Sequence, residues 1–373
     1  DYWGKTDTDR SETPSQRKHS MDVIVPGIGI EYAINEFQTV SVGVHKGFAP
    51  PGPGTSGVTD KAVDPETSMN TEIGFKSNQG LNSLEFTLFM NSYDNLLGAD
   101  TAASGGGTIN MNLSASGAYT LTGGAGVDNL TGGSGGDTIT GAAGNDIIAG
   151  GTGNDIITGG ADNDSLTGGG GNDTFNIDAG TDTVNDLATG DDLVVSSGAT
   201  ANAINITSFV ADSDTTNLGT VNLTARAAGG SIDMSSAGGS ASYNLISGAG
   251  TDTLKGDAGD DTFTIAAAGE GNNDTFDGDG GNDTLQLSTG SHALTDNSKV
   301  VNIETILAHS SGSTVDLTNQ TEVFTVTGGA GVDNLTGGTG NDIITGAGGN
   351  DIIAGGSGND TITGGADNDT LTG

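Results

Sequence analysis

Carboxylates recur along this chain at a fixed spacing of nine residues. In GGSGGDTITGAAGNDIIAGGTGNDIIT (132–158) every nonapeptide has Asp at its sixth position and Ile at its eighth. Asp supplies oxygen ligands that hard cations prefer, and the glycines before it let the backbone turn sharply with its carbonyl oxygens aimed inward. The three residues after the Asp favour extended backbone. The pattern therefore predicts cation-binding loops joined by short strands.

Fifteen strong copies of this nonapeptide form three sets, which begin near residues 123, 247 and 328. The second set slips by four residues across AAAGEGNND (266–274), and weaker copies with Asp182 and Asp191 follow the first set. We predict that the position-six carboxylates are the metal ligands: Asp128, Asp137, Asp146, Asp155, Asp164, Asp173, Asp252, Asp261, Asp274, Asp283, Asp333, Asp342, Asp351, Asp360 and Asp369. The pattern contains no His or Cys, so its oxygen-only ligands on flexible loops favour calcium over magnesium.

Two nonapeptides, or 18 residues, should make one coil of turn, strand, turn and strand. On that geometry Asp128, Asp146 and Asp164 stack along one edge, and the alternate aspartates stack along the other. Carboxylates one strand spacing apart, about 4.8 Å, repel one another unless a cation lies between them. We therefore expect calcium between successive coils.

Composition excludes several classes of protein. The chain has 373 residues with 67 Gly, no Cys and 4% aromatic residues, so it lacks both disulfides and a conventional large core. Residues 101–373 hold 34 acidic and 3 basic side chains, and 31 of those acids are Asp, which suits tight loops more than a solubilising tail. Nucleic acid is an unsuitable partner for such charge. No run approaches the roughly 18 apolar residues of a membrane-spanning helix.

The pattern G-G-x-G-x-D-x-U-x resembles the repeats-in-toxin (RTX) calcium-binding nonapeptide over residues 105–195 and 230–373. The resemblance implies an all-β fold, a right-handed parallel β-roll, with calcium held by position-six Asp and glycine-loop carbonyls. Ala142 and Ala347 at position two, and Asp162 and Asp367 at position four, depart from the pattern, so sites at those loops are expected to be altered. The alternative is a disordered acidic linker, which the regular apolar eighth position disfavours.

A longer period contains the short one. Residues 123–168 and 328–373 match at 39 of 46 positions, 205 residues apart. Each set follows a lead-in of two predicted strands (108–122, 231–247 and 314–327), which we expect to cap the stack. The predicted divisions are a first lead-in and roll (105–195), a β-rich spacer (196–230), a second lead-in and short block (231–295), and a spacer, lead-in and third block (296–373).

Residues 1–104 follow a different pattern. Apolar residues alternate in QTVSVGVHKGF (38–48) and SLEFTLFM (83–90), and residues 22–34 and 67–77 complete four predicted antiparallel strands. Short turns alternate with a long Pro/Gly loop (49–66), which is the rhythm of an outer-membrane barrel. The segment is similar to a late part of the barrel of TonB-dependent receptors. Four or five strands cannot close such a barrel, so this part alone should not transport anything.

These patterns predict a calcium-binding array at the cell surface or outside a Gram-negative bacterium, structural or adhesive, with calcium, the cell surface or other copies of the array as partners. Residues 1–104 would contact the outer membrane. The alternatives are a TonB-dependent receptor with a calcium-binding extension, or the non-catalytic part of a secreted hydrolase. Catalysis is not expected, since His19, His45, His292 and His309 form no H-E-x-x-H, and the G-x-S-x-G around Ser134 is a chance product of the repeats. Gly281 occupies a ligand position in the one EF-hand-like stretch, which rules that motif out.

Overall fold

The computed structural model describes residues 27–35, 38–49, 66–79, 82–94, 97–99, 108–110, 117–266 and 273–373. Every regular element in these ranges is a strand, which confirms the all-β prediction. The described part of the chain contains no helix long and apolar enough to cross a membrane. The chain divides into two compact units, Asp1–Asp94 and Asn95–Gly373.

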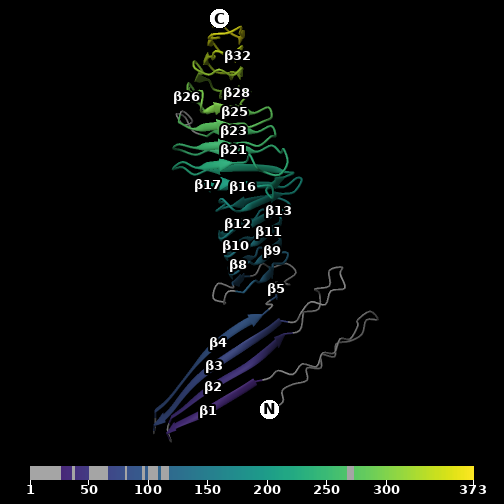
Figure 1. The fold of residues 1–373 in the computed structure, drawn as a ribbon, viewed down its shortest axis with the longest axis vertical. Coiled ribbons are helices and arrows are strands. Elements are labelled where there is room, and N and C mark those ends of the chain that lie inside the picture. The colour runs from purple at the N-terminus through teal and green to yellow at the C-terminus, as the bar shows by residue number, and fades with distance from the viewer. Residues whose placement is uncertain are drawn as a thin grey trace, which may run out of the picture. The chain divides into compact units, whose positions relative to one another are not determined.

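The first unit is a four-stranded antiparallel sheet in the order β1-β2-β3-β4 (Figure 1). Its strands are β1 (Gly27–Asn35), β2 (Gln38–Ala49), β3 (Glu66–Gln79) and β4 (Asn82–Asp94). The four predicted antiparallel strands are therefore present. Residues 22–26, His19 and most of the long Pro/Gly loop (50–65) lie outside the described residues.

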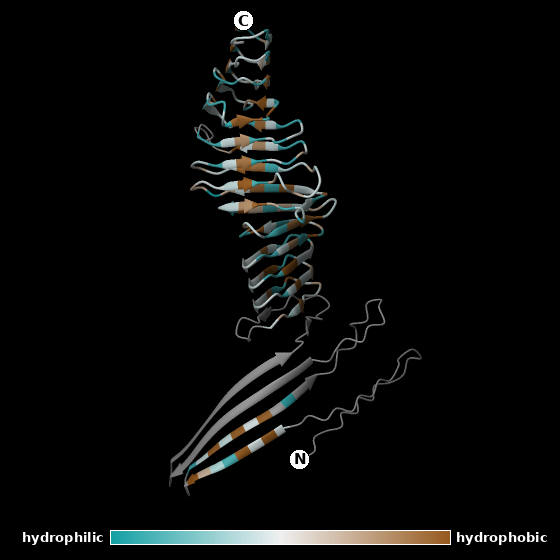
Figure 2. Cartoon of the chain, viewed as in Figure 1, coloured by the Kyte–Doolittle hydropathy of each residue, from teal (hydrophilic) through white to brown (hydrophobic). Residues whose placement is uncertain are grey.

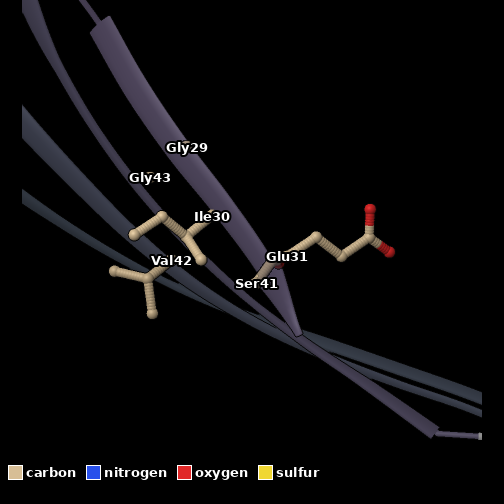
Figure 3. A pocket seen from close by; sticks show the side chains of 6 residues that line it. All are labelled: Gly29, Ile30, Glu31, Ser41, Val42 and Gly43. Atoms are coloured by element: carbon tan, nitrogen blue, oxygen red, sulfur yellow. The ribbon is translucent and has the colours of Figure 1, made fainter. Parts of the chain in front are cut away.

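Strands β1 and β2 separate apolar from polar side chains by simple alternation. Ile30 pairs with Val42 across the two strands, and both side chains are exposed on one face, while the next pair is Glu31 with Ser41. Figure 3 shows Ile30 and Val42 together and the Glu31 carboxylate pointing away from them. These four residues line a shallow depression with Gly29 and Gly43. One carboxylate in an open depression does not make a metal site.

The second unit is a stack of parallel strands joined in coils (Figure 1). One continuous 14-stranded sheet consists of β6 (Thr108–Asn110), β8 (Asn129–Ser134), β10 (Ile147–Thr152), β12 (Ser165–Gly170), β14 (Thr181–Val184), β16 (Thr200–Ile206), β19 (Thr220–Ala225), β21 (Asn244–Ser247), β23 (Thr262–Ile265), β25 (Thr284–Gln286), β28 (Thr305–Leu307), β30 (Thr325–Thr327), β32 (Ile343–Gly348) and β34 (Thr361–Ala366).

Three shorter parallel sheets provide the other strands of the coils. The first contains β5 (Leu97–Ala99), β7 (Thr120–Thr122), β9 (Thr138–Ala143), β11 (Ile156–Ala161), β13 (Thr174–Ile177), β15 (Asp192–Val195) and β18 (Thr216–Asn217). The second contains β17 (Ser208–Val210), β20 (Ser231–Asp233), β22 (Thr253–Lys255), β24 (Thr275–Asp277) and β27 (Val300–Val301). The third contains β26 (Gly290–Ala293), β29 (Ser313–Asp316), β31 (Asn334–Thr336), β33 (Ile352–Ala354) and β35 (Thr370–Thr372).

The nine-residue period produces an 18-residue coil, as predicted. Ile148 pairs in parallel with Leu130 on one side and Leu166 on the other, each 18 residues away. All three side chains are fully buried, because alternation along a short strand sends position eight into the roll. Small residues at the turns let one large side chain per strand fill a narrow core.

The second and third lead-ins are not caps, contrary to expectation, whereas β6 of the first lead-in is the end strand of the long sheet. Strands β20 and β21 of the second lead-in each pair on both sides, with β17 and β22 and with β19 and β23 respectively. Strands β29 and β30 of the third do the same. These segments bury apolar side chains such as Leu245 and Val326 in register with the repeats, so the stack continues through them.

Candidate metal sites

The position-six aspartates form two columns along the edges of the roll, at the start of each strand. Thirteen of the fifteen are buried: Asp128, Asp137, Asp146, Asp155, Asp164, Asp173, Asp252, Asp261, Asp274, Asp283, Asp333, Asp342 and Asp351. Asp360 and Asp369, in the last described coil, are half-buried. The structure thus brings the predicted ligands together within columns and keeps the two columns on separate sheets.

One oxygen of each carboxylate holds the neighbouring coil. The backbone N–H of Asp128 donates to Asp146 Oδ1 at 2.8 Å, and that of Asp146 donates to Asp164 Oδ1 at 2.8 Å. On the other edge, the N–H of Asp137 donates to Asp155 Oδ1 at 2.7 Å. Each Asp therefore satisfies a backbone donor 18 residues away, which fixes the register between coils.

The same hydrogen-bond pattern recurs in the second and third sets. The N–H of Asp261 donates to Asp283 Oδ1 at 2.7 Å over 22 residues. The four-residue slip in the sequence therefore lengthens a coil from 18 to 22 residues without breaking the column; part of it, 267–272, lies outside the described residues. In the third set, the N–H of Asp333 donates to Asp351 Oδ1 at 2.8 Å.

The second oxygen of several ladder carboxylates has no protein donor. Oδ2 of Asp146, Asp155 and Asp164 is buried and accepts no hydrogen bond. Leaving a buried carboxylate oxygen unsatisfied costs at least about 1 to 3 kcal/mol. These oxygens are consequently available to a ligand that supplies positive charge.

A main-chain oxygen of the next coil faces the same place. A Cβ built on Gly150 would lie 2.3 Å from Asp155 Oδ2 and 2.7 Å from the Gly168 carbonyl oxygen. One built on Gly141 would lie 2.2 Å from Asp146 Oδ2 and 2.5 Å from a carbonyl oxygen of the next coil. Position one must be glycine because any side chain would fill the space onto which a carboxylate and a carbonyl oxygen converge.

Carboxylates alone do not enclose a metal. Within the described ranges no three or more Asp, Glu, His or Cys side chains gather around one point. Neighbouring carboxylates at the strand spacing of roughly 4.8 Å repel by about 1 to 3.5 kcal/mol per pair at effective dielectric constants of 80 to 20. The donor set of carboxylate and carbonyl oxygens fits calcium, which accepts such mixed ligands in flexible geometry. Loop carbonyls would have to complete the coordination.

Comparison with known families agrees with this donor set. The family described as RTX calcium-binding nonapeptide repeat (4 copies) matches residues 149–184, 244–264, 267–290, 327–362 and 345–373. The chain carries RTX calcium-binding repeats. The family described as TonB dependent receptor-like, beta-barrel matches residues 1–141, which extends past the antiparallel sheet into the first RTX coils. None of the curated proteins matches the chain.

RTX repeats that depart from the pattern keep the loop shape. Ala142 and Asp162 adopt φ values of 87° and 78°, in the left-handed region that glycine normally occupies, and their counterparts Ala347 and Asp367 have φ values of 75° and 78°. Such a backbone costs a residue with a Cβ roughly 1 to 2 kcal/mol. Whether these loops bind calcium differently stays a prediction.

Three further carboxylates extend the RTX ladders beyond the predicted ligands. Asp182 Oδ1 accepts the N–H of Asp164, and Asp191 Oδ1 accepts that of Asp173, both at 2.9 Å. Asp182 and Asp191 keep the nine-residue spacing, so the sequence already identified them as weak copies of the repeat. Glu304 takes the same role, since its Oε2 accepts the N–H of Asp283 at 2.7 Å over 21 residues. No period reveals Glu304, because the coil length changes there.

His292 and His309, the two histidines whose side chains the structure describes, have neighbours other than Ser134. His292 is buried in register with Val315, and its Nε2 lies 2.9 Å from the Ser288 carbonyl oxygen. Nδ1 of His309 lies 2.8 Å from the hydroxyl of Ser311 in the same turn. Ser134 is the last residue of strand β8. Both histidines thus have structural surroundings, and neither matched family describes a catalytic domain.

Burial makes the RTX carboxylates hard to ionise without a metal. The pKa of Asp164 is raised to about 6, mainly by burial; the backbone N–H of Asp146 opposes this shift and repulsion from the Asp146 carboxylate adds to it. The pKa of Asp182 is raised to about 7, again mainly by burial. Asp261 has a pKa raised to about 7 for the same reason. In the metal-free roll these three carboxylates therefore keep their protons to a higher pH than exposed aspartates do.

This shift predicts an unusual pH dependence. The folded pKa values of about 6 to 7 exceed the ordinary value of 3.8, so the folded state binds more protons than the unfolded chain between pH 7 and pH 4. Metal-free protein should become more stable as the pH falls through this window. The melting temperature of the metal-free chain at pH 7.5 and at pH 5 measures this change in stability. The calcium-loaded chain is the control. Its melting temperature should fall at pH 5, because protons compete with calcium for the carboxylates. A metal-free chain that melts lower at pH 5 would contradict the proposed burial of ionisable ladders.

Proposed function

We propose that the chain is a calcium-dependent structural array of the bacterial cell surface or exterior, whose RTX loops fold around calcium. The fifteen position-six aspartates act as ligands, each through the oxygen that does not hold the neighbouring coil. Carbonyl oxygens of position-one glycines in the next coil contribute to the same sites. Calcium when bound supplies the positive charge that lets the two carboxylate columns stack.

The buried Oδ2 of Asp146, Asp155 and Asp164, which accepts no hydrogen bond, carries this proposal. A purely structural Asp ladder would need only Oδ1, which already bonds to the adjacent coil. A second oxygen held in the interior beside a carbonyl oxygen is unfavourable unless a cation or a proton joins it. At pH 7 and extracellular calcium, a cation is the available partner.

Selectivity between two divalent ions tests the proposal. Flexible loops with carbonyl ligands suit the six to eight oxygens of calcium better than the rigid octahedron of magnesium. We expect calcium to restore far-ultraviolet circular dichroism of the chelated chain at about 0.1 to 1 mM, and equal magnesium to restore little of it. Superimposable titrations with the two ions would refute calcium as the specific ligand.

Calcium dependence has a clear use for an exported chain. A ligand that binds only the folded state stabilises it in proportion to the logarithm of its concentration over the dissociation constant. Free calcium is scarce inside cells and abundant outside, so the array would stay extended during export and become rigid at its destination. The net charge of −38 keeps the calcium-free chain from collapsing.

The first unit favours a second role, attachment to the outer membrane. Its match to a TonB-dependent receptor barrel and the exposed apolar side chains Ile28, Ile30 and Tyr32 of strand β1 support this role. Apolar residues on one strand face and polar residues on the other are the pattern of membrane barrels. Fractionation of Gram-negative cells that express the chain should place it with the outer membrane. Recovery only from the medium or the periplasm would exclude attachment.

A further inference from the structure

The carboxylate columns are interrupted in the middle of the stack. In the 14-stranded sheet, the residues in register with Asp182 in the next three coils are Ala201, Val221 and Tyr243, and all three are buried. The column resumes at Asp261, whose Oδ1 accepts the N–H of Tyr243 at 2.7 Å. Apolar side chains thus replace three successive carboxylates on this edge.

The other edge has the same interruption. After Asp191 the next buried polar side chain at this edge is Thr215, whose Oγ1 accepts the N–H of Leu193 at 3.4 Å. The column begins again at Asp252, whose Oδ1 accepts the N–H of Gly230 at 2.6 Å. Residues 199–247, hereafter the central segment, therefore have no position-six carboxylate on either edge.

Neutral contacts hold the coils of the central segment together. The side chains of Asn202, Asn222 and Asn244 form a ladder in which Nδ2 donates to Oδ1 of the preceding coil at 2.8 and 2.7 Å. An amide can both donate and accept, so this ladder needs no cation. It replaces the charged ladder with one that is electrically neutral.

The central segment also has more apolar side chains per coil. Register offsets of 20 and 22 residues make its coils longer than the 18-residue RTX coil. The extra length buries Ile206, Phe209, Ile232 and Met234 in addition to Leu223 and its neighbours on the long sheet. Figure 2 shows hydrophobic stretches in brown on the broad strands near the middle of the stack. Such burial stabilises the coils without a ligand.

Within residues 101–373, basic side chains occur only in the central segment and in the coils that directly follow it. Arg226, Lys255 and Lys299 are the only three in residues 101–373. Lys255 Nζ lies 3.4 Å from Asp277 Oδ2 and 3.4 Å from Asp279 Oδ1 in the next coil. Lys299 Nζ donates to the Asn273 carbonyl oxygen at 2.8 Å. Lys255 and Lys299 thus bridge coils of the second set, next to the central segment.

We propose that the central segment, residues 199–247, is a calcium-independent core that stays folded without calcium and separates the first RTX ladder from the third. This inference rests on the proposed function, since it concerns where along the array calcium is required. In a stack each coil is coupled only to its neighbours. A segment that is folded at every calcium concentration cannot transmit the folding of one ladder to the other, so the two ladders respond separately.

Hydrogen exchange of the full chain, followed by mass spectrometry, tests the calcium independence. In chelator we expect amides of 200–206, 220–225 and 244–247 to remain protected, and those of 129–176 and 334–354 to lose protection. Loss of protection throughout would overturn the inference and leave the proposed function standing. Protection that is the same with and without calcium everywhere would overturn both.

A double substitution tests the separation. Asp146→Ala with Asp155→Ala removes one ligand from each edge of the first ladder. We expect the calcium midpoint for protection of 129–176 to rise several-fold, with that of 334–354 changing less than twofold. The control, Asp178→Ala with Asp214→Ala, removes equal charge from exposed positions that are not position six of any repeat and should shift neither midpoint. Parallel shifts of both ladders in the ligand variant would show that the central segment transmits folding, and would overturn the inference.

Discussion

Removing calcium is expected to abolish most of the β structure of residues 117–373, leaving a residual signal from the central segment. The cause is the stacking of buried carboxylates, which without a cation repel along both edges and leave Oδ2 of carboxylates such as Asp146, Asp155 and Asp164 unsatisfied. Far-ultraviolet circular dichroism of the full chain, with chelator added and then neutralised by excess calcium, measures the loss and its reversal.

The control for this experiment separates calcium from ionic strength. Sodium chloride at high concentration screens the exposed charges but cannot coordinate the buried oxygens. We expect salt to recover little of the lost signal and calcium to recover all of it. A spectrum unaffected by chelator, or one restored equally by salt, would contradict the calcium-dependent roll.

Gly150→Ala adds a single methyl group, and we expect it to lower stability and calcium affinity more than so small a change usually does. Its Cβ would lie 2.3 Å from Asp155 Oδ2 and 2.7 Å from a carbonyl oxygen of the next coil, so strand backbone must move to admit it. Overpacking of this kind costs about 1 to 3 kcal/mol. The substitution also occupies the space beside the proposed ligands, so a lower melting temperature and a higher calcium midpoint are both expected.

Gly170→Ala is the matched control. Gly170 also lies in a strand without a positive φ, and the nearest atom to its Cβ would be Thr152 Cγ2 at 3.9 Å. Its substitution should change stability by less than about 0.5 kcal/mol. Equal behaviour of the two variants in calcium would show that position-one glycines do not leave room for a ligand.

The regular part of the structure could be predicted from the sequence because one period encodes both chemistry and packing. Asp at position six and an apolar residue at position eight, such as Asp146 and Ile148, recur every nine residues. Because two repeats make one coil, the Asp lies at a turn edge and the apolar residue lies in the core. A single alternation within each strand then determines which side chains are buried. Coil length and the columns of candidate ligands follow from this simple geometry, while the parallel β-roll was implied by the resemblance to RTX repeats.

The irregular part could not be predicted in the same way. Glu304 joins a column only because a 21-residue coil brings it beside Asp283, and coil length is not encoded by any repeat there. In the sequence, Val221 and Asn222 have the pattern of ordinary strand residues. Only the strand register shows that Val221 occupies the place of a carboxylate in the column. The lead-ins were expected to cap stacks whose first coil would otherwise expose its apolar end, whereas in the second and third of them apolar side chains such as Leu245 and Val326 continue the core.

The role of Oδ1 also required the structure. A position-six Asp could have used both oxygens for a cation, but the distance of 2.8 Å from Asp128 N to Asp146 Oδ1 assigns one of them to the neighbouring coil. Each carboxylate therefore has two duties, and its substitution should affect coil register as well as calcium binding. Asp→Asn variants retain the Oδ1 acceptor and can separate the two effects.

Anomalous scattering from crystals grown in calcium tests the central claim most directly. We predict anomalous peaks in two rows, one along each edge of the roll, each peak between a position-six carboxylate such as Asp155 and the loop carbonyls of an adjacent coil. The rows should be interrupted over residues 199–247. A folded roll whose loops contain no anomalous peaks in calcium, or whose peaks lie away from the aspartate columns, would contradict the account.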